Sequence, residues 1–456
     1  MSFPRYPKYK ESGVEWLGEV PEHWEVQRLK HMAARIPYAI VDGPFGTQLK
    51  ADDYRPSGVP LVRISNLSFT GKFLEDDLVF IEDSKAEDVS RSTVRRGDVV
   101  IGKTGATIGK SALFDYSVKG VIASSCLKIS PDPDAVSSAF LGRIIESDGF
   151  QKTLLNESGG STRDTINITP FGNLAVVLPP LAEQLPICRF LDRETAKIDA
   201  LIAEQQRLIE LLQEKRQAVI SHAITKGLNP DAQMKESGIE WLGEVPRHWK
   251  TSRLKHASAK IVDCPHETPT YSDDGEYLVI RTPDLNDGCL LTEGMNRVDH
   301  AEYTDRTRRE ILQTGDIVYS REGGRWGHAA TVPEDERFCL GQRMMQFRAS
   351  EDWAAGYLMW HLTSRHVYAQ GEVDTAGAAS PHVNVGTISN YRLAHPPLDE
   401  QSQIARVLGS LAAGYDNLMN QAQNAITLLQ ERRSALISAA VTGQIDVRGL
   451  ASSEAA

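Results

Sequence analysis

Two stretches of the chain carry apolar residues at alternating steps of four and three, which is the spacing of a coiled-coil seam. Each stretch follows a Pro-Pro pair and ends near a glycine, Gly227 or Gly443. Proline is tolerated just before a helix and glycine commonly follows its end, so the pattern predicts two helices of about 35 residues, roughly 50 Å long. The predicted seams are Ile187, Leu191, Glu194, Ile198, Leu201, Gln205, Leu208, Leu212, Lys215 and Val219, and Ile404, Leu408, Leu411, Tyr415, Leu418, Ala422, Ala425, Leu429, Arg432 and Leu436.

Neither helix is expected to be stable alone, because its apolar stripe would face water. We therefore predict that the two seams pack against each other within one chain, as an antiparallel coiled coil. A coiled coil between two chains is the alternative. The polar seam positions Glu194, Gln205, Lys215 and Arg432 set the register of the pair or lie where the seam opens to solvent.

The long helices belong to an internal repeat. Residues 10–31 and 235–256 are identical at 17 of 22 positions. The Pro-Pro-Leu-x-Glu-Gln segment before the first helix recurs before the second. The segments between these shared blocks are only weakly similar, as where Gly97-Asp98-Val99-Val100 matches Gly315-Asp316-Ile317-Val318. One fold with two diverged surfaces, related by a pseudo-twofold axis, fits this pattern.

The two diverged segments mix short strands with short helices. Apolar runs predict strands and helices in both segments: strands at 61–64, 99–101, 112–114 and 127–129 with a helix near 137–146, then strands near 277–280 and 317–320 with a helix near 354–364. We therefore predict an α+β fold, in which two domains with small mixed sheets are separated by the pair of long antiparallel helices.

These assignments divide the chain into seven parts. They are a conserved N-terminal block at 1–31, an α+β domain at 32–177, the central long helix at 178–226, the repeated block at 227–256, a second α+β domain at 257–394, the C-terminal long helix at 395–446 and a flexible tail at 447–456.

Composition narrows the class of protein. The 456 residues are 41% hydrophobic and 24% charged, which is typical of a globular chain. No run approaches the roughly 18 apolar residues of a membrane span, and the polar N-terminus lacks a secretory signal. Five scattered cysteines without a CxxC pair favour neither a zinc site nor a disulfide framework. We expect a cytoplasmic protein with buried thiols and no membrane partner.

One loop of each α+β domain carries a cation among glycines. Gly102 to Ser111 resembles a phosphate-binding P-loop, but Gly105 and Gly109 are separated by three residues where four are needed. The matching loop has Arg321 in place of Lys103 and no Gly-Lys-Ser, so a nucleotide site is not predicted. Such a cation can instead meet a phosphate or a base edge. A tight structural turn is the alternative.

Other polar and aromatic residues recur at similar places. Arg63 and Arg281 follow apolar strand residues, where a guanidinium can bind guanine or phosphate, or form an internal ion pair. Phe45, His266 and His382 lie in loops. No histidine has the spacing of a metal ligand, such as HExxH, so no metal is expected.

The shared blocks contain four tryptophans, Trp16, Trp24, Trp241 and Trp249. Near-identical blocks predict two equivalent sockets for them, either within the fold or on two copies of one partner. The sequence contains no methyl-transfer tetrad, no nuclease-like carboxylate-lysine cluster and no Gly-x-Ser-x-Gly elbow. We therefore predict that the chain is not catalytic by itself.

The arrangement resembles the specificity subunit of a type I restriction–modification enzyme, over about residues 12–446. The resemblance is carried by Gly-x-x-Pro-x-x-Trp at Gly18–Trp24 and Gly243–Trp249, and by Pro-Pro-Leu-x-Glu-Gln at Pro179–Gln184 and Pro396–Gln401. Two further segments look like the target-recognition domains of that family: Asp263-Cys264-Pro265-His266-x-Thr-Pro and Leu340-Gly341-Gln342-Arg343.

The resemblance implies that each α+β domain is a target-recognition domain, which reads one half of a split site in double-stranded DNA while the helices fix the gap. Two methyltransferase subunits would dock on the shared blocks and bring S-adenosylmethionine for adenine methylation. Two restriction subunits would add ATP-driven translocation and Mg²⁺-dependent cleavage. The chain itself would bind no cofactor. Half-sites one turn apart lie roughly 34–36 Å from each other, the same order as the predicted helix length.

The candidate residues follow from these motifs and from two clusters of arginines. Those expected to contact DNA are Phe45, Arg63, Arg95, Arg96, Lys103, Thr104, Thr107, Arg163, His266, Arg281, Arg308, Arg309, Arg321, Arg325 and His382. Those expected to dock partners or to hold the fold are Trp16, Trp24, Trp241, Trp249, Glu183, Gln184, Glu400 and Gln401.

The charge argues against tight DNA binding by this chain alone. The formal net charge is −11, and residues 31–177 hold 16 basic and 18 acidic side chains, against 13 and 21 in residues 256–394. We expect weak, salt-sensitive binding, with much of the phosphate contact supplied by partners. A stand-alone DNA-binding regulator, a scaffold that binds only proteins and an enzyme with a cryptic active site are the alternatives.

Overall fold

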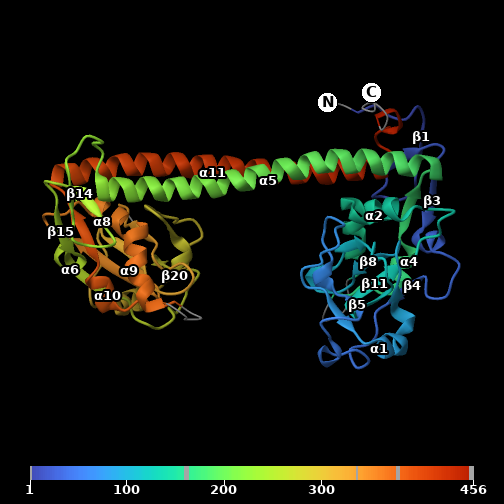
Figure 1. Cartoon of the computed structure of the whole chain (residues 1–456), viewed down its shortest axis with the longest axis horizontal. Coiled ribbons are helices and arrows are strands. Elements are labelled where there is room, and N and C mark those ends of the chain that lie inside the picture. The colour runs from blue at the N-terminus through green and yellow to red at the C-terminus, as the bar shows by residue number, and fades with distance from the viewer. Residues whose placement is uncertain (1–2, 159–163, 335–336, 376–380, 451–456) are drawn as a thin grey trace. The chain divides into compact units, whose positions relative to one another are not determined.

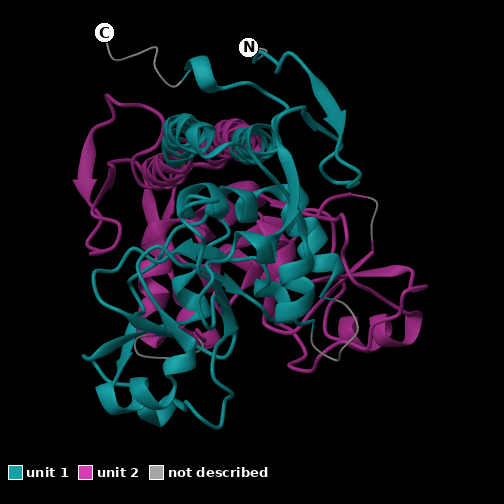
Figure 2. Ribbon diagram, turned by 90° about the vertical axis from the view of Figure 1, so that its right-hand side faces the viewer, with its two compact units in different colours: residues 1–204, 425–456 teal, residues 205–424 magenta. Residues whose placement is uncertain are grey.

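The computed structural model describes residues 3–158, 164–334, 337–375 and 381–450, which form two compact units. Unit 1 comprises residues 1–204 and 425–456, and unit 2 comprises residues 205–424 (Figure 2). The boundary falls inside both long helices, α5 (Leu181–Lys226) and α11 (Leu398–Val441) (Figure 1). Each helix therefore contributes one part to each unit.

Unit 1 builds its α+β domain from two four-stranded sheets, with the orders β4-β11-β8-β9 and β6-β5-β10-β7. In the second sheet β5 and β10 run parallel. Two smaller sheets, β1-β2 and β12-β3, belong to the shared block and its junction with the domain. The elements are β1 (Tyr9–Glu11), β2 (Glu19–Pro21), β3 (Glu25–Arg28), β4 (Ile40–Asp42), β5 (Val59–Val62), β6 (Val79–Ile81), α1 (Asp83–Asp88), β7 (Thr93–Val94), β8 (Val99–Gly102), β9 (Ser111–Leu113), β10 (Gly120–Ile122), β11 (Cys126–Ile129), α2 (Ser138–Glu146), α3 (Asp148–Asn156), α4 (Ile168–Asn173) and β12 (Ala175–Leu178).

Unit 2 repeats this topology. Its sheet β16-β24-β21-β22 matches β4-β11-β8-β9, and β20-β17-β23 matches β6-β5-β10, again with a parallel central pair. The elements are β13 (Met234–Glu236), β14 (Glu244–Pro246), β15 (Lys250–Arg253), α6 (Leu254–Ala257), β16 (Ser258–Asp263), β17 (Tyr277–Ile280), β18 (Leu285–Asn286), β19 (Cys289–Leu290), β20 (Arg297–Val298), α7 (His300–Thr307), β21 (Ile317–Ser320), β22 (Ala329–Thr331), β23 (Phe338–Leu340), β24 (Met344–Ala349), α8 (Ala355–Leu362), α9 (Arg365–Thr375), α10 (Val385–Ser389) and β25 (Arg392–His395).

The predicted α+β fold is confirmed in both units. The strands expected at 277–280 and 317–320 are β17 and β21 with those bounds, and β5 begins and ends two residues before the expected 61–64. Short 3-10 turns fill several of the connections: η1 (Leu29–Met32), η2 (Ala51–Asp53), η3 (Ile64–Asn66), η4 (Ser90–Ser92), η5 (Gly105–Thr107), η6 (Thr282–Asp284) and η7 (Arg448–Leu450).

The long helices pair as predicted, and each seam is covered inside its own unit. In unit 1 Ile187 and Leu191 of α5 share a core with Ile437 and Val441 of α11. In unit 2 Ile220 and Ile224 of α5 share a core with Ile404 and Leu408 of α11. Early residues of one helix meet late residues of the other, so the pair is antiparallel in each unit.

The helices are longer than the predicted 35 residues, with 46 residues in α5 and 44 in α11. Both begin directly after the Pro-Pro pairs, several residues before the first seam position. Pro186 lies in the second turn of α5, just ahead of Ile187, where it removes one backbone N–H donor.

The predicted seam is confirmed only in part beyond its first turns, where Ile198 and Ala422 are buried as predicted but other predicted positions are not. Leu201, Leu208, Leu411 and Leu418 are exposed, as are Lys215 and Arg432. Near the start of both helices the seam positions are separated by four, four and three residues. This eleven-residue spacing shifts the buried stripe relative to the predicted seven-residue repeat. Thr195 and Ala412 occupy the extra step because the base of each helix packs against its α+β domain as well as its partner helix. The buried residues beyond that step include Ala422, Ile426, Arg216, Ile220, Arg433 and Ile437.

The described N-terminal residues pack against those that follow α11. The Asp446 amide donates to the Pro4 carbonyl at 2.7 Å, and the Tyr9 hydroxyl donates to the Gly443 carbonyl at 2.9 Å. Val447 is buried and Arg448 lies 3.2 Å from Glu183, so residues 447–450 form part of unit 1. Residues 451–456 of the expected tail lie outside the described residues.

Four of the five cysteines are buried, as expected, and burial raises the pKa of the Cys126, Cys188 and Cys339 thiols to about 12. Cys289 is exposed, contrary to the expectation, because it lies on the two-residue strand β19. Among the described residues, no helix is both long and apolar enough to cross a membrane.

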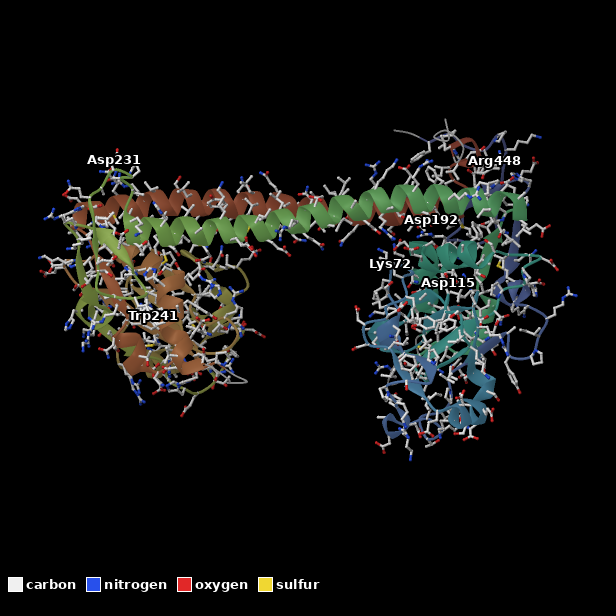
Figure 3. All side chains as sticks on the ribbon, in the orientation of Figure 1. Lys72, Asp115, Asp192, Asp231, Trp241 and Arg448 are labelled. Carbon is white, nitrogen blue, oxygen red and sulfur yellow. The ribbon has the colours of Figure 1, made fainter. Side chains whose placement is uncertain are left out.

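A buried arginine joins the two helices to the α+β domain in each unit. In unit 1 Arg433 of α11 lies 2.9 Å from Asp199 of α5 and 2.6 Å from Glu146 of α2. In unit 2 Arg216 of α5 lies 3.4 Å from Asp416 of α11, and it donates to the Asp287 carbonyl at 2.8 Å. Lys72 and Asp192, labelled in Figure 3, line a cavity of about 410 Å³ beside the unit 1 pairs.

We predict that Arg433→Ala lowers the free energy of unfolding of unit 1 by about 3 kcal/mol, because it removes one of the two cations that pair with the buried Glu146 and leaves only Arg143. Arg207→Ala is the control, since Arg207 forms an exposed pair with Glu210 on α5 and should cost at most about 1 kcal/mol. Hydrogen exchange read separately in α2 and α8 measures both. Equal effects of the two substitutions would contradict the role of Arg433.

Unit 2 contains a buried histidine pair that unit 1 lacks. The His361 Nε2 accepts from the Ala394 amide at 2.9 Å, and its Nδ1 lies 3.0 Å from the His366 Nε2. Burial lowers the pKa of His361 well below its usual value and that of His366 to about 3. The matching positions in unit 1, 217 residues earlier, are Ile144 and Gly149.

We predict that unit 2 is the more acid-sensitive unit. Because both histidines bind protons more weakly in the folded state, protonation favours the unfolded state once the pH is below the unfolded pKa of about 6.5. The free energy of unfolding is therefore unaffected above that pH and decreases as the pH drops below it. At pH 5.5 the loss is about 1.4 kcal/mol per histidine, or about 3 kcal/mol for the pair. Hydrogen exchange of α8 and α2 at pH 7.5 and 5.5 should show a larger loss of protection in α8, and an equal or smaller loss would refute the prediction.

Candidate nucleic-acid interface

The shared blocks place Trp24 and Trp249 in sockets within the fold. Both side chains are fully buried. The Trp24 Nε1 donates to Glu183 at 3.1 Å, and the Trp249 Nε1 donates to Glu400 at 3.0 Å. His23 and His248 each lie 2.9 Å from the same two carboxylates. These tryptophans are therefore not available to a partner.

Gln184 and Gln401 connect the start of each long helix to the α+β domain. The Gln184 oxygen accepts from the Ser137 amide at 2.7 Å, and its amide donates to the Ala135 and Pro179 carbonyls. Gln401 makes the same contacts with Ala354, Asp352 and Pro396. Both glutamines are buried, so the role that the structure gives them is structural.

Trp16 and Trp241 differ although their blocks are near-identical. Trp16 packs against Phe150 of α3 with ring centroids 6.4 Å apart, in space left by Gly149, where a Cβ would stand 2.5 Å from the indole. The residue of unit 2 that matches Gly149 is His366. Trp241, labelled in Figure 3, is 43% exposed. Of the four tryptophans it is the most accessible.

The two cation loops share one backbone frame. The Lys103 amide donates to the Ser125 carbonyl, and the Lys103 carbonyl accepts from the Ile166 amide, at 2.9 and 3.0 Å. Arg321 makes the same two bonds with Arg343 and Val383, each at 3.1 Å. Each cation also pairs with an aspartate at 3.0 Å, Lys103 with Asp42 and Arg321 with Asp263. The frame is thus constant while the side chains differ.

In unit 2 the loop collects three of the predicted residues into one charged cluster. The Arg321 guanidinium is almost fully buried and lies 3.0 Å from His266 and 3.1 Å from His382. Glu322 is 3.1 Å from both Arg321 and His382. The two imidazoles are exposed, so they form the outer surface of the cluster.

In unit 1 the same frame carries fewer charges. Thr104 pairs with Thr165 in a β-bridge, and the Thr107 hydroxyl donates to the Thr104 carbonyl at 2.7 Å. Phe45, which stands where unit 2 has His266, is 72% exposed. The structure therefore holds Lys103, Thr104 and Thr107 in one loop.

Several other candidates are held by contacts inside the protein. Arg63 donates to the Asp77 carbonyl, and Arg281 forms a two-pronged pair with Asp284 at 3.2 Å, which is the internal ion pair considered as the alternative. Arg325 donates to the Leu285 carbonyl at 2.7 Å. These contacts occupy part of each guanidinium.

The arginine clusters are mostly exposed. Arg95 is exposed, Arg96 lies 2.5 Å from Asp115, which Figure 3 labels, and Arg308 lies 3.4 Å from Asp305. Arg309 is exposed and donates to the Asp263 carbonyl at 3.0 Å. Their neighbour Arg306 is instead buried, bonded to the Leu340 and Glu267 carbonyls, and cannot reach a DNA backbone. Arg163 lies outside the described residues.

Sequence reasoning gave no role to the acids that hold the cations, Asp42, Asp263 and Glu322. The repeat offers a signal for two of them, because Asp42 and Asp263 each stand three residues before Phe45 or His266. Their pairing with Lys103 and Arg321, about 60 residues away along the chain, is not visible in a single sequence. Sequence reasoning also named Arg343 only as the last residue of a motif and gave it no role of its own. In the described part of the chain no group of three or more His, Cys, Asp or Glu is arranged to hold a metal ion.

Comparison with known proteins identifies the repeated domain. The family model of the type I restriction modification DNA specificity domain matches residues 44–211 and 246–428. The chain is 21% identical to the type I restriction enzyme EcoKI specificity subunit of Escherichia coli, over 94% of this chain and 90% of that protein. It is 23% identical to the MjaVIII specificity subunit of Methanocaldococcus jannaschii, over 97% and 98%.

A solved structure from a study of complex assembly and conformational transition of the type I R-M system has the same fold. It aligns with a TM-score of 0.63 at 18% identity and covers 92% of this chain and 98% of that chain.

Proposed function

The chain belongs to the family of type I restriction modification DNA specificity domains, and we propose that it is the subunit that directs a type I restriction–modification complex to a split DNA site. Each α+β domain, at residues 32–177 and 257–394, reads one half of that site. The chain itself performs no chemistry.

One observation carries this proposal. The loops around Lys103 and Arg321 keep the same backbone bonds and the same aspartate–cation pair, yet they present different side chains to solvent. A fixed frame with variable loop residues is how a scaffold reads different ligands with one fold. Because Phe45 and Thr104 stand in one loop system and His266 and Glu322 in the other, the two half-sites should differ in sequence.

The DNA contacts are proposed at exposed and half-buried members of the candidate set. Phe45, Thr104, Thr107, His266 and His382 are placed to meet base edges. Arg95, Arg96, Arg308 and Arg309 are placed to meet phosphates. Three other candidates, Arg63, Arg281 and Arg325, stabilise loops through their hydrogen bonds inside the protein. They reach DNA only with the N–H donors that these bonds leave free.

Partners supply the catalytic chemistry. We propose that two methyltransferase subunits with S-adenosylmethionine and two restriction subunits with ATP and Mg²⁺ assemble on this chain in the cytoplasm. Exposed leucines recur at matching positions of the two long helices, Leu201 with Leu418 and Leu211 with Leu428. Such paired apolar side chains suit two copies of one partner. In unit 2, Trp241 is a further exposed apolar side chain that a partner can contact.

Sequencing of modified bases tests the function. DNA from a host that expresses this chain with its neighbouring methyltransferase should carry N6-methyladenine in a split motif on both strands, and the methyltransferase alone should give none. No methylated motif from a soluble complex of the two proteins would contradict the proposal and favour a scaffold or a regulator.

The helix pair is proposed to set the gap between the half-sites, and lengthening it tests this. From the Asp199–Arg433 pair to the Arg216–Asp416 pair, each step forward along α5 matches one step back along α11. By the same register, Ala203 lies level with Leu429. Seven residues inserted after Ala203 and seven after Leu428 preserve the seam and add about 10 Å, or about three base pairs.

We expect this variant to recognise a longer gap or to lose recognition, with both half-sites unchanged where methylation persists. The control exchanges residues on the exposed face of α5 without changing its length. An unchanged gap at full activity would contradict the role of the helices as a spacer.

A further inference from the structure

Arg343 has a backbone conformation that arginine rarely adopts. It lies between β23 and β24 with φ of +76°, and in the described part of the chain only one other non-glycine residue, Tyr38, has a positive φ. A residue held in this left-handed region is strained, and such strain gathers at functional sites. The residue of unit 1 that matches it, Ser125, is not in this region.

The frame of the cation loop holds Arg343 in this conformation. The Arg343 carbonyl accepts from the Arg321 amide at 3.1 Å, and Arg321 is itself fixed by Asp263, Glu322 and His382. The next residue, Met344, is fully buried in β24. The backbone of Arg343 therefore cannot relax without disturbing the buried cluster.

The Arg343 side chain is exposed, and among the described residues it forms no hydrogen bond or ion pair. Its Nη1 lies over Gly323, 3.5 Å from the point where a Cβ on that glycine would stand. Gly323 has φ of +79° and follows the Arg321–Glu322 pair. The guanidinium thus stands above the loop that we propose to face DNA, with its donors free.

We propose that Arg343 is a specificity-determining residue that binds a guanine in the half-site read by unit 2. This inference rests on the proposed function. The planar guanidinium offers paired N–H donors, which match the O6 and N7 acceptors that guanine presents in the major groove. A left-handed backbone on a buried frame fixes the direction of the side chain, which a base contact needs and a phosphate contact does not. Ser125 cannot make this contact in unit 1.

The test compares Arg343→Gly with Arg343→Ala in the full chain, co-expressed with the methyltransferase. Both variants lose the guanidinium, but glycine adopts a positive φ without strain. Arg343→Gly should therefore melt at or above the temperature of the natural chain and above Arg343→Ala. Any loss of specificity in the glycine variant then reports the side chain and not the fold. Arg337→Gln, an exposed arginine of the same unit outside the cluster, is the control.

The readout is the methylated motif by sequencing. In the natural chain one half-site should contain an invariant guanine. Arg343→Gly should tolerate other bases at that position, reducing discrimination by about 5- to 150-fold, while the other half-site stays unchanged. Arg337→Gln should keep the full motif.

Three results would overturn the inference: an unchanged motif in Arg343→Gly, an even loss of methylation at every site, which would place Arg343 on a phosphate, or a natural motif without guanine in the affected half. A natural chain that yields no split motif at all would instead refute the proposed function, and with it this inference.

Discussion

The structure depends on two adjacent side chains at the start of each long helix. Glu183 and Glu400 accept the indole N–H of a buried tryptophan from the shared block, while Gln184 and Gln401 bind the loop that leads into α2 or α8. One turn of helix thus joins the block, the helix and the α+β domain. A buried indole N–H left without an acceptor is costly, so the carboxylate and the tryptophan are retained together. This joint is the same in both units, and it leaves the distal loops free to differ.

The buried arginines extend the same constraint along the helices. Arg433 and Arg216 each bridge the opposite helix and the α+β domain of their unit. A charge buried in such a network tolerates few arrangements, because any shift leaves it unpaired. The orientation of each domain on its own part of the helix pair is therefore specific. The loops at the sheet edge diverge on this constant base, since Lys103 with threonines and Arg321 with histidines occupy one frame. A constant junction between helices and domain, combined with variable loops, is what a protein that recognises two different half-sites requires.

Much of this could be predicted from the sequence, because repeats and periodic patterns are local signals. The internal repeat, the antiparallel helix pair and the α+β domains follow from spacing alone. The seam was only partly right beyond its first turns, since Thr195 and Ala412 are buried beside the adjacent domain, and a helix pattern alone cannot show that contact. The sequence analysis placed His266, Arg321 and His382 in loops but did not predict that they cluster, because the three residues and their carboxylate partners come from distant segments. Arg63 and Arg281 were ambiguous between DNA and an internal pair, and only their bonds to Asp77 and Asp284 show what they contact. The left-handed backbone of Arg343 leaves no trace in a single sequence.

The central claim is that the two cation loops face different halves of one DNA site. A photo-crosslinking amino acid at Ala106 or Gly324, which are exposed at matching places three residues after Lys103 and Arg321, tests it most directly. In the complex with the methyltransferase and its target duplex, the account predicts crosslinks from position 106 to nucleotides of one half-site and from position 324 to nucleotides of the other. Crosslinks from both positions to the same half-site, or from neither in a complex that still binds its target, would contradict the account.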